Sequence, residues 1–148
     1  MTPLRRAGAS DVERALQRVP LFSDLRTSTL RRVARLAEAR EFAPDALIIR
    51  EGEPANAFYI LLEGRAEVFR GKRAVRVATL RAGDFFGEMA LLDSFPRAAS
   101  VRATAPSRCL VLARWDFLRE LRLHPAIAIQ MLPVLSRRIR ELETTLLP

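Results

Sequence analysis

The chain has 148 residues, 49% of them hydrophobic, which is enough for one domain with a single core. No segment approaches the roughly 20 apolar residues that a membrane-spanning helix requires, so we expect a cytoplasmic protein. The formal net charge is +8, and the positive excess lies in residues 1–40 and 97–148. No nucleic-acid recognition motif accompanies this charge, so solvated basic helix faces explain it better than a nucleic-acid interface.

The rarest residue types argue against an enzyme and against a metal centre. Cys109 is the single cysteine and lies in an apolar run, which indicates a buried core residue and excludes an internal disulfide. His124 is the single histidine, and its place before Pro125 indicates a capping or surface residue rather than a catalytic one. One cysteine and one histidine cannot form a dedicated zinc site. We therefore expect no catalysis, no metal and no cofactor.

The N-terminal region, residues 1–38, is predicted to be helical. Ser10 and Glu13 have the spacing of a capping box, in which a hydroxyl and a carboxylate satisfy free backbone amides. A first helix should therefore run from Ser10 to Pro20. A second helix is predicted to begin near Ser28, because apolar residues recur on one helical face after it.

From Glu41 the pattern changes to short apolar runs separated by turn residues. The runs are 46–49, 57–62, 66–69, 74–80 and 109–113. Turn signals at this regular spacing predict a small antiparallel barrel or jelly roll rather than a parallel sheet. The predicted fold class is therefore α+β, with an antiparallel, jelly-roll-like β-roll over residues 39–113 and helices at both ends.

The C-terminal region, residues 114–148, is predicted to be helical again. One helix should run from Trp115 to Leu123, and a second pattern starts at Pro125. Pro133 lies inside that pattern, where proline removes a hydrogen bond, so the helix should kink or restart there. An apolar stripe follows, formed by Leu135, Ile139, Leu142 and Leu146. We interpret residues 1–148 as a single domain.

The most informative stretch is Phe86 to Leu91, followed after four residues by Pro96 to Val101. Gly87 permits close backbone approach, and the amides of a short helix predicted at 88–92 would face an anion. Arg97 can pair with two phosphate oxygens. Glu88 would be repelled by a phosphate and is better explained as accepting a hydrogen bond from a ribose hydroxyl. The alternative is that Arg97 and Glu88 simply pair with each other.

This stretch resembles the phosphate-binding cassette of the cyclic nucleotide-binding domain family. The family includes regulatory subunits of cyclic-AMP-dependent protein kinase, cyclic-nucleotide-gated channels and the bacterial catabolite activator protein. Other segments resemble the family in the same order, namely 19–22, 42–44, 49–53, 58–61 and 63–68. The chain departs from the family pattern at Asp45, where a turn glycine is usual, although aspartate tolerates left-handed backbone.

The resemblance implies a set of ligand-binding residues. Arg97 would hold the cyclic phosphate and Glu88 the ribose 2′-hydroxyl. Backbone amides of Gly87, Ala90 and Ala98 would complete the anion cradle, with Met89 inside the same cassette. Ser100 either lends its hydroxyl to the site or caps a local turn. Val68 is either a contact of the purine or a plain core residue, and Leu80 is a weaker candidate for the same contact.

The resemblance does not identify the residue that covers the base. The last helix offers no aromatic residue, so Leu135, Ile139 or Arg138 would have to cover the purine. Ala98 stands where cyclic-GMP-preferring kinases tend to have threonine, which favours cAMP over cGMP as the ligand.

We therefore expect a stand-alone bacterial sensor that binds cAMP, or possibly cGMP, and relays occupancy to a protein partner through its last helices. Two alternatives stay open. The cassette could be structural, with the stripe from Leu135 to Leu146 binding a partner helix or a second copy. The domain could also belong to a DNA-binding regulator, although the chain ends at Pro148, where such regulators append a helix-turn-helix, so direct DNA binding is not expected.

Overall fold

The computed structural model describes residues 9–19, 22–23, 25–87 and 96–146. In these residues, two helices precede eight strands and two helices follow them. The elements are α1 (Ala9–Gln17), α2 (Thr27–Leu36), β1 (Glu38–Phe42), β2 (Leu47–Ile49), β3 (Ala57–Glu63), β4 (Arg65–Arg70), β5 (Val75–Arg81), β6 (Phe85–Phe86), β7 (Ser100–Ala103), β8 (Ser107–Ala113), α4 (Arg114–Leu123) and α5 (Pro125–Leu146).

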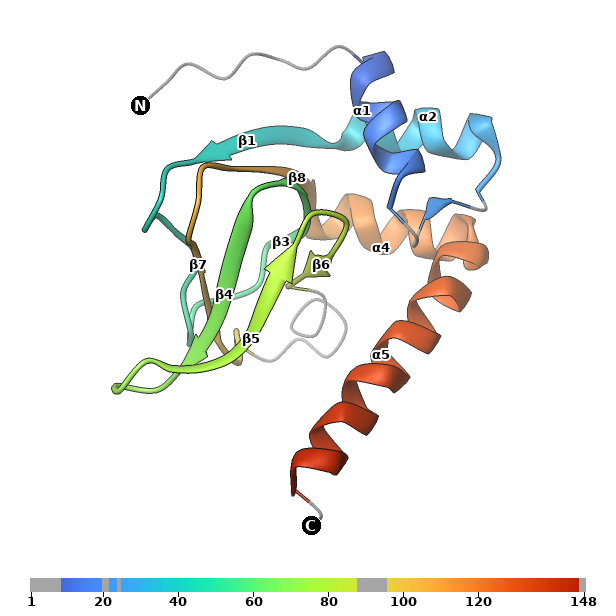
Figure 1. Ribbon diagram of the computed structural model, residues 1–148. Coiled ribbons are helices and arrows are strands. Elements are labelled where there is room, and N and C mark those ends of the chain that lie inside the picture. The colour runs from blue at the N-terminus through green and yellow to red at the C-terminus, as the bar shows by residue number, and fades with distance from the viewer. Residues whose placement is uncertain (1–8, 20–21, 24, 88–95, 147–148) are drawn as a thin grey trace.

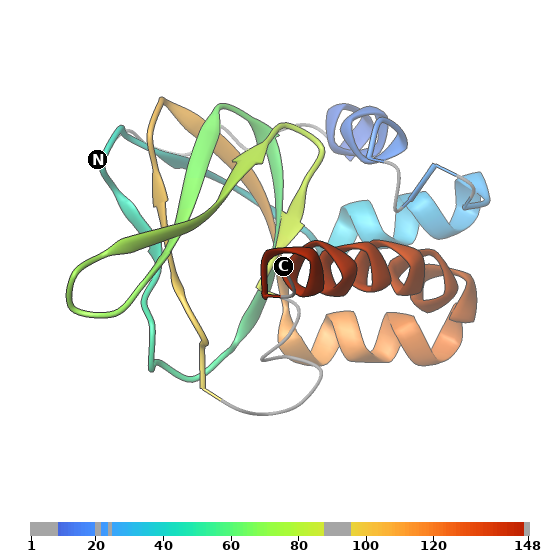
Figure 2. The same ribbon diagram turned by 60° about the horizontal axis from the view of Figure 1, so that its bottom comes forward.

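The strands form two antiparallel four-stranded sheets that together make a roll. One sheet has the order β1-β8-β3-β6 and the other the order β2-β7-β4-β5. Figures 1 and 2 both place the helices on one side of this roll. The predicted fold class, an antiparallel β-roll with helices at both ends of the chain, is confirmed.

Strand β3 lies between two hydrophobic cores. Its side chains alternate, so Phe58 and Ile60 join the core beneath the helices while Tyr59 and Leu61 join the core inside the roll. A strand that is buried on both faces is apolar at successive positions, which explains the uninterrupted apolar run at 57–62. The helices close the first core with Leu16, Leu30, Phe117, Ile127 and Met131.

Three strands were not among the predicted apolar runs. Strand β1 is at the edge of its sheet, and its Glu38 and Arg40 form an exposed ion pair at 3.2 Å. Strand β6 has only two residues, and β7 is interrupted by the charged Arg102. Strands that are short, or that bury one face only, lack the continuous apolar pattern by which the others were predicted.

The turn between β1 and β2 contains Asp45, which has φ of 70°. This left-handed conformation was predicted for the position where an aspartate replaces the usual glycine. The Asp45 amide donates a hydrogen bond to the carbonyl of Ala103 at 2.8 Å, so the turn is tied to β7.

The last helix does not restart at Pro133, and the kink predicted there stays a prediction. Helix α5 is continuous from Pro125 to Leu146, and Figure 1 shows one unbroken ribbon. Pro133 lacks the amide that would bond to the carbonyl of Ile129, but both residues are exposed, so water can satisfy that carbonyl. Although α5 has 22 residues, no helix in the described residues is long and apolar enough to cross a membrane.

Candidate functional site

The described residues include five of the eight predicted ligand-binding positions. Gly87, Arg97, Ala98, Ser100 and Val68 can be placed. Glu88, Met89 and Ala90, with the short helix predicted at 88–92, lie outside the described residues. The geometry of the candidate site therefore rests on the two ends of the predicted cassette, one at β6 and the other before β7.

The Arg97 side chain is buried, with 6% of its surface exposed. Its Nη1 donates a hydrogen bond to the carbonyl of Gly87 at 2.5 Å, and its Nη2 donates to the carbonyl of Ala57 at 2.7 Å. A buried guanidinium is stable only when its donors are satisfied, and carbonyl oxygens provide this without cancelling its charge. The contact between Arg97 and Gly87 joins the two ends of the predicted cassette.

Gly87 meets two requirements that another residue would not. Its φ is +84°, in the left-handed region that favours glycine. A Cβ atom at this position would lie 2.8 Å from Nη1 of Arg97 and 3.3 Å from Cδ1 of Ile49. The absence of a side chain therefore lets the guanidinium reach the backbone of this turn.

The loop after β2 holds the other end of the cassette in place. The Arg97 amide donates to the Glu53 carbonyl, and the Gly52 amide donates to the Arg97 carbonyl, both at 2.9 Å. The Glu51 amide donates to the Ser100 hydroxyl oxygen at 2.9 Å. This bond ties the loop after β2 to the start of β7, and the two roles predicted for Ser100 stay predictions. The Glu51 carboxylate also accepts from the Gly71 amide at 2.9 Å, which links this loop to the hairpin between β4 and β5.

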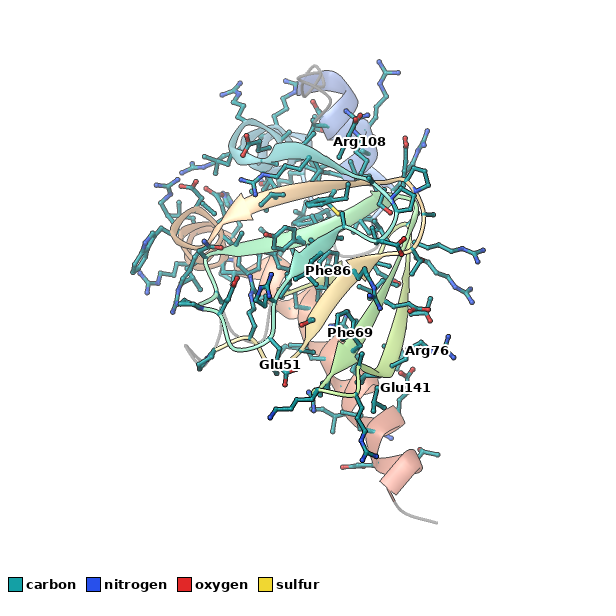
Figure 3. The ribbon with its side chains drawn as sticks, turned by 90° about the vertical axis from the view of Figure 1, so that its left-hand side faces the viewer. Glu51, Phe69, Arg76, Phe86, Arg108 and Glu141 are labelled. Atoms are coloured by element: carbon teal, nitrogen blue, oxygen red, sulfur yellow. The ribbon has the colours of Figure 1, made fainter. Side chains whose placement is uncertain are left out.

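The interior of the roll beside Arg97 is apolar. Leu80 is buried there, and Val68 packs against the same core while pairing with Ala78 and Val101 in neighbouring strands. The ring of Phe86 stacks on Tyr59 with centroids 5.2 Å apart. Figure 3 shows Phe86 within the roll and Glu51 on the loop after β2. Both Val68 and Leu80 are thus core residues of the roll, and their predicted contact with a purine stays a prediction.

Cys109 and His124, the single cysteine and the single histidine, occupy structural positions. Cys109 is buried, and burial raises the pKa of its thiol from 9.0 to about 12, so the thiol is protonated at neutral pH. His124 ends α4, where its Nε2 lies 3.6 Å from Glu120. The described residues contain no group of three or more metal-ligating side chains of the His, Cys, Asp or Glu type. The arrangement around Arg97 is suited to binding an anion at the edge of an apolar interior.

The three residues predicted to cover a base lie on one face of α5 but differ in burial and contacts. Leu135 is half-buried, and Ile139 is 57% exposed. Arg138 donates from Nη2 to the Phe85 carbonyl at 2.7 Å, with its guanidinium carbon 4.7 Å from the centre of the Phe85 ring. Phe85 was not singled out from the sequence, because its partner is 53 residues away and no local pattern marks the contact.

Comparison with protein families matches residues 39–124 to the cyclic nucleotide-binding domain. The chain belongs to this family. The match covers the roll, both described ends of the predicted cassette and α4, and it confirms the family predicted from the sequence. The match does not test the individual ligand-binding residues, which stay predictions for this cyclic nucleotide-binding domain.

Curated relatives of the domain are parts of longer proteins. A cAMP-dependent protein kinase regulatory subunit from Hypocrea atroviridis is 40% identical over 107 residues, covering 72% of this chain and 23% of that protein. A putative potassium channel protein from Rhodopseudomonas palustris is 35% identical over 125 residues, covering 82% of this chain and 30% of that protein. The chain thus spans less than a third of these relatives. Because they come from a fungus and a bacterium, the bacterial origin stays a prediction.

Solved structures of the cyclic nucleotide-binding domain match the whole arrangement of roll and helices. The catabolite activator protein of Thermus thermophilus has a TM-score of 0.77 and 31% identity, over 86% of this chain and 61% of that chain. The regulatory domain of Toxoplasma gondii PKA with cAMP has a TM-score of 0.76 and 29% identity, over 90% of this chain and 50% of that chain.

Proposed function

We propose that this cyclic nucleotide-binding domain is a non-enzymatic sensor of cAMP. The observation that carries the proposal is the buried Arg97 guanidinium, which meets the Gly87 carbonyl at the edge of an apolar interior. A cyclic phosphate presents two non-bridging oxygens, which a guanidinium can bind in a fork, while the apolar interior suits the purine. The Toxoplasma gondii regulatory domain solved with cAMP supports the choice of ligand.

The other residue roles belong to the same proposal. Glu88 accepts from the ribose 2′-hydroxyl, and the amides of Gly87, Ala90 and Ala98 complete the anion cradle. Met89 lies within this cradle. Val68 and Leu80 present their apolar side chains to the purine from the interior of the roll, where both already pack. Ala98 offers no hydroxyl to the 2-amino group of guanine, which favours cAMP over cGMP.

The proposal extends to the arrangement of the chain and its partner. Residues 1–148 form one domain, in which α4 and α5 transmit occupancy of the site to a protein partner in the cytoplasm. No direct binding to DNA is included in this function.

Calorimetric titration of the purified chain with cAMP and cGMP tests the proposal. We expect the wild type to bind cAMP more tightly than cGMP. Arg97→Ala should weaken cAMP binding about 100-fold or more, because a buried charge-assisted contact to the phosphate is lost. Arg97→Lys keeps the charge but not the fork and should weaken binding less. Arg50→Ala is the matched control, because Arg50 is exposed and pairs with Glu53.

Two results would count against this function. Absence of cAMP binding by the wild type at millimolar concentration would exclude a cAMP sensor. Equal binding by wild type and Arg97→Ala, with both proteins showing the same thermal unfolding, would exclude the phosphate role of Arg97. Circular dichroism of each variant separates lost binding from lost folding.

A second candidate function is self-association through α5. It is favoured by the exposure of Leu132, Ile139 and Leu142 on this helix, at 62%, 57% and 56%. Their spacing of seven and three residues places them along one stripe, as in a short coiled coil. Light scattering with and without cAMP tests it. A dimer that forms without nucleotide and dissociates in Ile139→Glu would favour this function, whereas a monomer at every concentration would exclude it.

A further inference from the structure

The hairpin formed by β4 and β5 carries a dense positive charge. From Arg65 to Arg81 the sequence has six basic residues and one acidic residue, Glu67. All six basic residues are exposed, and among them only Arg76 forms an ion pair with a described residue, 3.6 Å from Glu67. Figures 1 and 2 show the turn of this hairpin projecting from the roll on the side away from the helices. The hairpin therefore presents a largely uncompensated positive charge to the solvent.

Arg65 and Arg81 lie directly opposite each other at the base of the hairpin. Their neighbours Ala66 and Leu80 are buried in the core inside the roll, so the two arginine side chains point to the outer face of the sheet. Like charges at directly opposite positions destabilise an antiparallel pair of strands. Neither guanidinium has an ion pair with a described residue that would offset this repulsion. A local rule that is broken at exposed positions indicates that these charges serve a function.

The same outer face has an apolar area beside the arginines. Leu47 of β2 is 38% exposed and pairs with Arg102 of β7, whose guanidinium carbon lies 4.8 Å from the centre of the half-buried Phe69 ring. Arginines around an apolar centre are typical of protein–protein interfaces. A site for single-stranded nucleic acid would need a free aromatic ring on which bases stack, whereas Arg102 already lies over Phe69. This face therefore suits a protein better than a nucleic acid.

We propose that the outer face of the β4–β5 hairpin is a docking surface for an acidic segment of a partner protein, with Arg65 and Arg81 as its anchors. Carboxylates accept paired hydrogen bonds from guanidinium groups, and their charge would relieve the repulsion between these two arginines. Arg76 and Arg81 are five residues apart on β5, which is about 16 Å at the rise of a strand. An extended acidic segment of about five residues can therefore reach all three arginines. This surface lies on the outside of the roll, whereas the Arg97 guanidinium is buried, so the inference does not depend on cyclic nucleotide binding.

Fluorescence anisotropy with a labelled peptide tests the docking surface. The probe is a peptide of about twelve residues in which glutamate and serine alternate, because alternate side chains of a strand share one face. We expect the double variant Arg65→Gln with Arg81→Gln to weaken binding of this peptide about tenfold or more at about 0.15 M salt. The control combines Arg35→Gln with Arg122→Gln. It removes two exposed helix arginines that have no ion pair within the described part of the chain, and it should change binding less than about twofold.

Three results of this titration would overturn the docking surface. The first is the absence of peptide binding by the wild type at millimolar concentration. The second is equal weakening in the two double variants, because the peptide would then respond only to net charge. The third is displacement of the labelled peptide by oligothymidylate of the same length at a lower concentration than by unlabelled peptide, because the face would then prefer nucleic acid.

Thermal unfolding tests the repulsion between Arg65 and Arg81. We expect Arg65→Gln and Arg81→Gln each to unfold about 1–3 °C above the wild type, because each removes one member of the like-charged pair. Arg73→Gln is the matched control, since Arg73 lies in the turn outside the strand register and should shift the midpoint by less than about 1 °C. Lower unfolding temperatures in both pair variants would overturn the inference, because the two arginines would then stabilise the hairpin instead of awaiting a partner.

Discussion

Phe58 of β3 and Phe117 of α4 lie face to face, with ring centroids 4.3 Å apart and an angle of 6° between the ring planes. Both side chains are fully buried. Because β3 is a central strand of its sheet, this pair joins the roll to the helices that follow it. The orientation of α4, and hence the starting direction of α5, depends on this contact.

Phe117→Leu and Phe58→Leu should each destabilise the domain by about 1–3 kcal/mol, because each loses aromatic area and leaves a partly filled cavity. The loss of unfolding free energy in the double variant should be about 0.5–1.5 kcal/mol smaller than the sum of the two single losses, because each single variant already loses the stacking energy. Urea unfolding monitored by circular dichroism measures all three free energies. Strict additivity would show that the two rings contribute independently.

The parts of this fold that could be predicted from the sequence are those with a local signature. The run at 57–62 marked β3 because both faces of that strand are buried, and the ten-residue spacing of Gly87 and Arg97 marked an anion site. Strand β1 had no such signature, because an edge strand with Glu38 and Arg40 is largely exposed.

The contacts that position the candidate site are mostly long-range. The Arg97 guanidinium bonds to the carbonyl of Ala57, 40 residues away, and Arg138 bonds to the carbonyl of Phe85, 53 residues away. Any residue type offers a backbone carbonyl, so no side-chain pattern could indicate these acceptors. A restart of the helix at Pro133 was not found for a related reason, since the solvent exposure that makes this proline tolerable within one helix is a property of the folded protein.

Gly64 and Gly71 allow a matched comparison of two glycines with left-handed backbone, at φ of +98° and +78°. A Cβ on Gly64 would meet the Ser107 hydroxyl and the Pro106 carbonyl, whereas a Cβ on Gly71 would have no atom within 4 Å. Gly64→Ala should therefore destabilise the domain by about 2–4 kcal/mol, from strain and steric overlap together, and Gly71→Ala by about 1 kcal/mol from strain alone. Thermal and urea unfolding measure the stability of both variants. Similar losses of unfolding free energy in the two variants would contradict the steric argument.

Glu120 of α4 is buried and bonds to the Nε of Arg32 from α2 at 3.0 Å. Arg32→Gln should destabilise the domain by about 1–3 kcal/mol at pH 7, because it leaves a buried carboxylate without its charged partner. Adding Glu120→Gln should recover part of this loss. Arg119→Gln is the control, since Arg119 forms an exposed pair with Asp116 and should cost less than about 0.5 kcal/mol. Equal losses of unfolding free energy in Arg32→Gln and Arg119→Gln, measured by urea unfolding, would show that the buried pair stabilises the domain no more than the exposed pair does.

The Cys109 thiol should make the stability of the domain fall at alkaline pH. Burial raises its pKa from 9.0 to about 12, so the thiol stays protonated in the folded protein while it ionises above pH 9 in the unfolded chain. The unfolded state then binds fewer protons, and the free energy of unfolding decreases as the pH rises from 9 towards 12. Between pH 7 and pH 10 this amounts to about 1.4 kcal/mol. Cys109→Ala removes the thiol, so the difference in unfolding free energy between wild type and variant should narrow by this amount over the same interval. Urea unfolding of both proteins at pH 7, 9 and 10 measures it, and pH profiles that run parallel would show that the thiol ionises equally in both states.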